Sequence, residues 1–110
     1  TLSLFNATAV YGQVTLNWVT ELEYNTVGYN LYRATSPDGE QVKVNSAIIP
    51  SLLLMGKTPP FEYLFVDSNI LPGVTYFYWL EEIATDGKEF YGPVQVTTPP
   101  YGIFLPLMRR

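Results

Sequence analysis

The segment from Leu71 to Leu80 places the tightest constraint on the fold of this chain. It begins with the turn formers Pro72 and Gly73 and continues as an alternating, aromatic-rich run that is typical of a long β-strand. A buried tyrosine at the head of such a strand can bond its hydroxyl to the backbone of the preceding turn. We therefore predict a tyrosine corner in a β-sandwich, with the Tyr76 hydroxyl bonded to backbone near Leu71.

Short segments with a period of two recur along the chain, separated by turn residues. This pattern favours an all-β fold over a helical or α/β fold. Ser36-Pro37-Asp38-Gly39 and Asp86-Gly87 are turn signals, and the second predicts a two-residue hairpin between the last two strands. The about seven antiparallel strands expected from this pattern are Ser3–Ala9, Gln13–Thr20, Gly28–Ala34, Gln41–Asn45, Glu62–Asp67, Val74–Thr85 and Lys88–Thr97.

The register of that hairpin predicts an irregularity in the last strand. A loop at Asp86-Gly87 pairs Leu80 with Pro93, which turns the valines that follow away from the core. We expect a β-bulge at Gly92-Pro93, because glycine tolerates the bulge dihedrals and proline cannot donate to the ladder. With this bulge, the predicted inter-sheet core comprises Trp18, Tyr29, Leu31, Tyr76, Tyr78, Leu80, Val94 and Val96.

Together with the predicted corner, two further motifs carry a resemblance to a known family. These are Val14-Thr15-Leu16-Asn17-Trp18 and Gly28-Tyr29-Asn30-Leu31-Tyr32-Arg33, and over roughly Leu4 to Thr98 the chain resembles a fibronectin type III domain. The run from Trp18 to Arg33 is similar to such modules in secreted or surface bacterial proteins. The resemblance implies an immunoglobulin-like sandwich of fibronectin type III topology, an extracellular location and no catalytic residue.

The chain length fits one domain, which we place at residues 1–98, with a C-terminal extension at 99–110. The extension contains Ile103-Phe104-Leu105-Pro106-Leu107-Met108, followed by two arginines. We expect this segment to pack on the domain as a further β extension; the alternative is an address read by export machinery. Because residue 1 is Thr and not Met, we also expect the chain to be part of a longer polypeptide.

Charge and composition exclude several classes of partner. The net charge of −4 repels phosphates, so nucleic acid is not an expected partner. No apolar run approaches the ~20 residues of a membrane span. The chain contains no His and no Cys, which removes the usual general base, the thiolate nucleophile and the common zinc ligands.

The carboxylates do not form a predicted catalytic or metal site. Glu81 and Glu82 are consecutive on a strand and point to opposite faces of the sheet, so they cannot flank one glycosidic bond. Glu21 and Glu23 follow Trp18 in a loop, where carboxylates commonly accept backbone N–H bonds. Asp67-Ser68-Asn69 has too few oxygen ligands for Ca²⁺ and is expected to form a turn. We predict no catalytic residue, metal or cofactor.

The alternation of side chains along the strands also places Tyr32, Phe77 and Trp79 together on the outer face of one sheet. Such a face has three possible explanations. The connection 48–61 or the C-terminal extension covers it, it packs against a neighbouring domain, or its rings stack on sugars. We expect Trp79 to be substantially covered within the domain. If the rings are open instead, the three residues are the candidate ligand-binding set.

These observations predict a non-catalytic spacer or protein-interaction module at the C-terminal end of a larger secreted or cell-surface bacterial protein. Its expected partners are neighbouring domains of the same polypeptide or another protein. The alternative is a carbohydrate-binding accessory module of an extracellular hydrolase, with polysaccharide as the ligand. Solvent exposure of the three outer rings discriminates between the two.

Overall fold

The structure, a computed structural model, describes residues 2–101. Those residues form eight β-strands and no helix, so the predicted all-β fold is confirmed. The strands are β1 (Leu2–Val10), β2 (Gln13–Thr20), β3 (Thr26–Ala34), β4 (Val42–Lys43), β5 (Ile49–Pro50), β6 (Phe61–Asp67), β7 (Thr75–Ala84) and β8 (Gly87–Thr97).

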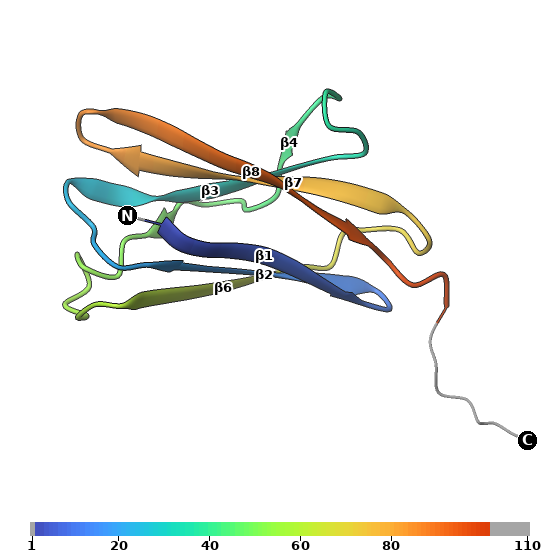
Figure 1. The fold of residues 1–110 in the computed structure, drawn as a ribbon, viewed down its shortest axis with the longest axis horizontal. Helices are drawn as coiled ribbons and strands as arrows, with labels where there is room; N and C mark the ends of the chain where they lie inside the picture. Colours follow the sequence, from blue (N-terminus) through green and yellow to red (C-terminus); the bar gives the residue numbers. More distant parts are fainter. Residues whose placement is uncertain (1, 102–110) are drawn as a thin grey trace, which may run out of the picture.

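The strands form two antiparallel sheets that pack face to face (Figure 1). One sheet has the order β1-β2-β6, and the other has the order β4-β3-β7-β8 with β5 also paired to β3. The left side of Figure 1 gathers the β2–β3 loop, the segment before β6 and the β7–β8 hairpin. The β1–β2 turn and the C-terminal end of β8 lie at the opposite end of the sandwich.

The core between the sheets follows the predicted alternation of inward and outward side chains. In β2 every second residue is buried, because alternate side chains of a strand point to the same face. The six predicted aromatic and leucine positions of the core are all buried, and Val94 and Val96 pack against them while partly exposed. Sequence reasoning did not include four further buried members of this core, which are Val14, Leu16, Phe61 and Tyr63.

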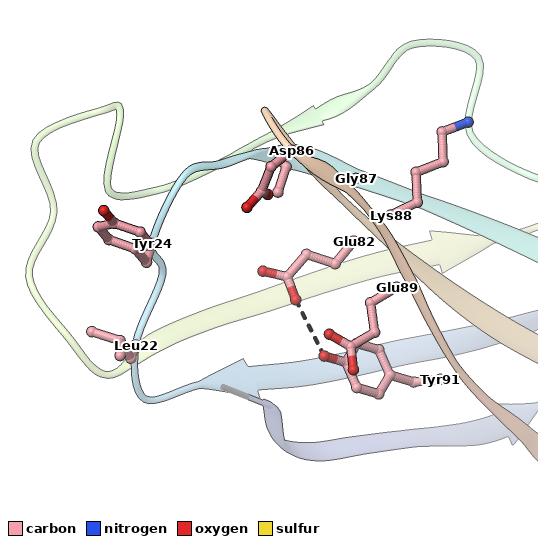
Figure 2. Close-up of a pocket in the computed structure, with 9 residues that line it drawn as sticks. Leu22, Tyr24, Glu82, Asp86, Gly87, Lys88, Glu89 and Tyr91 are labelled. Carbon is pink, nitrogen blue, oxygen red and sulfur yellow. Dashed lines mark hydrogen bonds between the residues drawn. The ribbon is translucent and has the colours of Figure 1, made fainter.

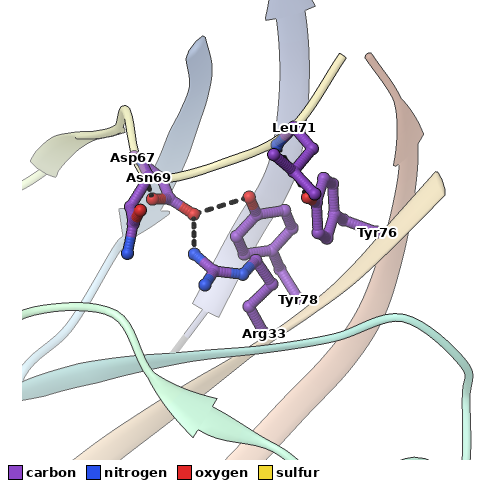
Figure 3. A network of polar contacts seen from close by, with 6 residues as sticks. All are labelled: Arg33, Asp67, Asn69, Leu71, Tyr76 and Tyr78. Carbon is purple, nitrogen blue, oxygen red and sulfur yellow. Dashed lines mark hydrogen bonds and ion pairs between the residues drawn. The ribbon is translucent and has the colours of Figure 1, made fainter. Parts of the chain in front are cut away.

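The tyrosine corner is present as predicted. The Leu71 backbone N–H donates to the Tyr76 hydroxyl oxygen at 2.8 Å, and Figure 3 shows the two residues side by side. Gly73 adopts φ +71°, a left-handed conformation that suits glycine in the turn. The Thr98 hydroxyl closes the corner by donating to the Leu71 carbonyl at 2.7 Å.

Replacement of Tyr76 by phenylalanine tests the hydroxyl of this corner separately from the buried ring. We expect a loss of about 1 kcal/mol in the free energy of unfolding, because one hydrogen bond disappears and the Leu71 N–H loses its acceptor. Urea unfolding followed by circular dichroism measures this loss. An unchanged midpoint would show that the corner bond does not stabilise the fold.

The hairpin between β7 and β8 is present, but its loop lies one residue earlier than predicted. Ala84 pairs with Gly87, so the loop residues are Thr85 and Asp86. Thr85 leaves the ladder because its N–H donates to the Asn25 carbonyl at 3.0 Å. As a result Leu80 pairs with Tyr91, and the predicted pairing of Leu80 with Pro93 is wrong.

The predicted β-bulge at Gly92-Pro93 is confirmed. The register shifts between the Leu80–Tyr91 pair and the Tyr78–Val94 pair, so two residues of β8 oppose Trp79 alone. Gly92 has φ +116°, and a Cβ atom there would lie 2.7 Å from the Tyr78 carbonyl oxygen. Only glycine fits this position without a shift of the backbone.

The predicted strand at 41–45 is too long, since only Val42–Lys43 pairs with β3. The Asn45 side chain takes over the place of a ladder partner. Its Oδ1 accepts the Leu31 N–H at 2.8 Å, and its Nδ2 donates to Asn30 Oδ1 and to the Ala47 carbonyl. Sequence reasoning also missed β5, whose two residues lie inside the connection 48–61.

Candidate functional site

Glu23 lies at the centre of a buried polar cluster at one end of the sandwich. Its side chain is only 3% exposed, although it follows β2 in a loop. Its carboxylate accepts hydroxyl hydrogen bonds from Thr20 at 3.1 Å, Tyr29 at 2.7 Å and Ser51 at 2.6 Å, and another from Tyr63. We refer to these five residues as the Glu23 cluster.

The hydrogen bonds of the cluster keep Glu23 ionised. Burial alone would raise the pKa of its carboxyl, but the hydroxyls of Ser51, Tyr63 and Tyr29 donate to the charged form and hold the pKa below its usual range. The expectation that this carboxylate accepts backbone N–H bonds is met by the Leu53 N–H at 3.4 Å. Hydroxyl donors supply most of the hydrogen bonds to this carboxylate, so it links β2, β3, β6 and the segment at Ser51.

Asp67 is a second buried carboxylate with a structural role (Figure 3). Its Oδ2 atom accepts bonds from the Arg33 guanidinium at 2.6 Å and from the Tyr78 hydroxyl at 2.8 Å. Its Oδ1 atom accepts the Asn69 N–H at 3.1 Å, which forms the turn predicted for this segment. Burial, followed by the bond to Asp67, raises the pKa of Tyr78.

Glu81 and Glu82 face opposite sides of their sheet, as predicted. Glu81 is buried and binds Asn30 Nδ2 at 3.1 Å, the Tyr32 hydroxyl at 2.8 Å and the Lys88 ammonium at 3.4 Å. Glu82 accepts bonds from Thr26 at 2.6 Å and Tyr91 at 3.3 Å. The two carboxylates therefore serve separate networks and cannot act together on one bond.

The depressed pKa of Glu23 predicts a loss of stability in acid. A carboxyl whose folded pKa lies below its unfolded value of about 4.3 contributes stability that is fully present above that value and disappears as pH falls through the folded pKa. Glu81 has the same direction of shift, since its partners outweigh the effect of burial on its pKa. We expect the melting temperature to be constant from about pH 7 to pH 5 and to fall below about pH 4.

Thermal melts at a series of pH values measure this acid limb. The Glu23→Gln variant is the matched control, because it cannot lose a charge at that site and should show a shallower fall. A melting temperature that does not change down to about pH 2.5 would contradict the ionised state of both carboxylates.

The predicted aromatic face exists, but most of it is covered. The register places Trp79 beside Tyr32, and Phe77 lies on the same face two residues earlier. Trp79 is only 8% exposed, which confirms its predicted covering, while Tyr32 and Phe77 are half-buried. Phe90 is 56% exposed, with its ring centroid 6.4 Å from that of Tyr32. Ligand binding by this face remains a prediction.

The connection 48–61, one of the two expected covers, closes the end of the sandwich that contains Glu23. Its Ser51 N–H donates to the Val27 carbonyl, and its Leu52 N–H donates to the Tyr63 hydroxyl. Leu52 packs against the core, whereas Leu53, Leu54 and Met55 are exposed. The other expected cover, the C-terminal extension, lies outside the described residues from position 102 onward.

Three segments meet at this end of the sandwich, and we call them together the loop end: residues 21–25, 51–57 and 85–88. The Glu23 cluster joins the first two, and the bond from Thr85 to Asn25 joins the first to the third. The loop end displays large apolar side chains that are between 43% and 79% exposed, namely Leu22, Tyr24, Leu53, Leu54 and Met55.

A cleft of about 390 Å³ opens at the loop end, between residues 21–25 and the β7–β8 hairpin (Figure 2). Leu22 and Tyr24 line one side, and Glu82, Glu89 and Tyr91 line the other. Sequence reasoning missed this site. Leu22 and Tyr24, two large apolar residues in one loop, were the available signal, since exposed apolar residues that gather on a surface mark interaction sites.

No protein-family model and no curated protein matches this chain. Within residues 2–101 there is no helix with the length and hydrophobicity needed to cross a bilayer. The loop end and the buried carboxylates are the features of the molecule that bear on its function.

Proposed function

We propose that this domain is a non-catalytic interaction module that contacts its partner through the loop end. The observation that carries the proposal is the Glu23 cluster, in which a buried carboxylate holds together two loops that display exposed apolar side chains. A pre-ordered apolar surface loses little conformational entropy on binding, so it is suited to docking. The other buried carboxylates, Asp67 and Glu81, are likewise engaged in hydrogen bonds that stabilise the fold.

The proposal includes the resemblance to fibronectin type III domains. The tyrosine corner at Tyr76, the fully buried Trp18 and the arrangement of β1-β2-β6 against β3-β7-β8 support it. Such a module in a secreted or cell-surface bacterial protein would space other domains or dock against them. A neighbouring domain of the same polypeptide or a separate protein can supply the partner surface.

A carbohydrate-binding role has weaker support. One observation favours it, the exposed Phe90 ring beside Tyr32. The burial of Trp79 counts against it, because stacking on a sugar requires an accessible ring face. Binding of a polysaccharide that disappears in the Phe90→Ala variant, measured by calorimetry, would favour this role over the interaction module.

Site-specific photo-crosslinking tests the proposed contact surface. A photoreactive phenylalanine analogue replaces Tyr24 in the loop end or, as a matched control, Tyr11 at the other end of the sandwich; both tyrosines are exposed. We expect cross-links from position 24, in the parent polypeptide or to a bound protein, and few from position 11. Equal yields from both positions, or none from position 24, would refute the loop end as the contact surface.

A further inference from the structure

The chemistry of the loop end indicates what kind of segment it binds. Tyr24, Leu54 and Met55 are large side chains of the loop end, and each is more than half exposed. The cleft, which Tyr24 lines, contains the carboxylates of Glu82 and Glu89, with Asp86 at the hairpin. A complementary segment must therefore combine large apolar side chains with a cation.

The negative charge of the cleft is not neutralised by its own lysine. Lys88 belongs to the cleft wall, but its ammonium bonds to Glu81 at 3.4 Å, and Figure 2 shows the side chain directed away from Glu82. The pKa of the Tyr91 hydroxyl reflects the negative charge around it. Burial and then the charges of Glu82 and Glu89 raise its pKa.

One segment of this chain has the required combination. Residues 103–108 are Ile-Phe-Leu-Pro-Leu-Met, and Arg109 and Arg110 follow directly. With a net charge of −4, two copies of the chain repel each other over most of their surfaces. Contact between the arginines of one copy and the acidic cleft of another reverses that repulsion locally.

The length of the segment limits its reach toward the cleft of its own molecule. The cleft lies at the hairpin end of β8, while Tyr101 follows the other end of that strand. The eleven residues of β8 span about 33 Å at ~3.3 Å per residue. Met108 is seven residues beyond Tyr101, which gives a reach of at most about 25 Å in a fully extended chain. This reach is shorter than β8, so a second copy can bring the whole of residues 103–110 to the loop end more readily than the same molecule can.

We propose that the loop end binds residues 103–110 of a second copy of this chain, so that copies associate head to tail. The inference rests on the proposed function, because it names the partner of the same surface. The contact is heterologous, with different surfaces on the two copies, so each bound copy leaves one free loop end and one free C-terminal segment.

Two charge-reversed chains test this pairing without removing any part of the molecule. The first carries Asp86→Lys and Glu89→Lys at the hairpin, and the second carries Arg109→Glu and Arg110→Glu. Sedimentation velocity measures association of each 110-residue chain. We expect the unaltered chain to associate with rising concentration. Each altered chain alone should associate at least about tenfold more weakly, because two charge pairs are lost.

The decisive measurement is the mixture of the two altered chains. The basic segment of the first chain fits the acidic cleft of the second, and the acidic segment of the second fits the basic cleft of the first. We expect the mixture to recover the association of the unaltered chain. Asp38→Lys with Glu40→Lys, which reverses the same number of charges in an exposed loop away from the cleft, is the matched control and should associate normally.

Three results would overturn the inference: an unaltered chain that stays monomeric, a mixture that does not recover association, or an equal loss in the control. The proposed function has a separate outcome. Cross-links from position 24 to a different protein would keep the loop end as a contact surface while removing the second copy as its partner. Absence of all cross-links from position 24 would remove both.

Discussion

Replacement of Trp18 by alanine is expected to unfold the domain. The Trp18 ring is completely buried, stacks on Tyr63 with centroids 5.1 Å apart and planes 3° apart, and contacts Tyr29 at 5.6 Å. Its loss leaves a cavity between the sheets. Truncation of a buried Trp costs about 3 to 5 kcal/mol, which reaches the lower end of the stability of a small domain, about 5 to 15 kcal/mol.

Trp18→Phe is the matched control for this variant. The indole N–H makes no hydrogen bond within residues 2–101, so phenylalanine removes volume without leaving a hydrogen-bond partner unpaired. We expect Trp18→Phe to fold with a reduced melting temperature and Trp18→Ala to show the circular dichroism of an unfolded chain. A folded Trp18→Ala variant with an unchanged melting temperature would contradict the position of Trp18 in the core.

The second large effect is expected for Glu23→Ala. This change removes the acceptor of four hydroxyl groups and leaves the buried hydroxyls of Tyr29, Ser51 and Tyr63 without their carboxylate partner. Removal of one side of a buried charged network costs about 3 to 5 kcal/mol. We expect the free energy of unfolding, measured by urea titration, to fall by this amount.

Glu21→Ala is the matched control, since Glu21 is an exposed carboxylate two residues earlier in the same loop. We expect its effect to stay within about 0.5 kcal/mol, as is usual for surface substitutions. Equal stabilities of the two variants would show that the Glu23 cluster does not contribute to the fold. A large loss for Glu23→Ala alone would identify the cluster as the support of the loop end.

Much of the sandwich could be predicted because the relevant signals are local. The alternation from Tyr76 to Leu80 specifies a face for each side chain, and Pro72-Gly73 specifies the turn that the corner requires. The bulge at Gly92-Pro93 was also predictable, because the two strands of one hairpin must present their apolar residues to the same core. These inferences need only the order of residues within one or two strands.

The loop end could not be predicted in this way. Glu23 is bonded by residues that are distant in the sequence, since Ser51 is 28 positions away and Tyr63 is 40 positions away. No local pattern distinguishes a loop glutamate that collects such donors from an exposed one such as Glu21. The loop displacement at Thr85 has the same origin, because it depends on a bond to Asn25 in another segment.

The bulge in β8 has a consequence for how natural variation in this strand should be interpreted. Before Gly92 the core-facing position is the odd-numbered Tyr91, and after Pro93 the core-facing positions are the even-numbered Val94 and Val96. Tolerance to polar substitution should therefore alternate along β8 and change phase once, at the bulge. An alignment that places a gap within this strand would exchange the inward and outward positions, whereas a phase change at residues 92–93 is the expected mark of a correctly aligned relative.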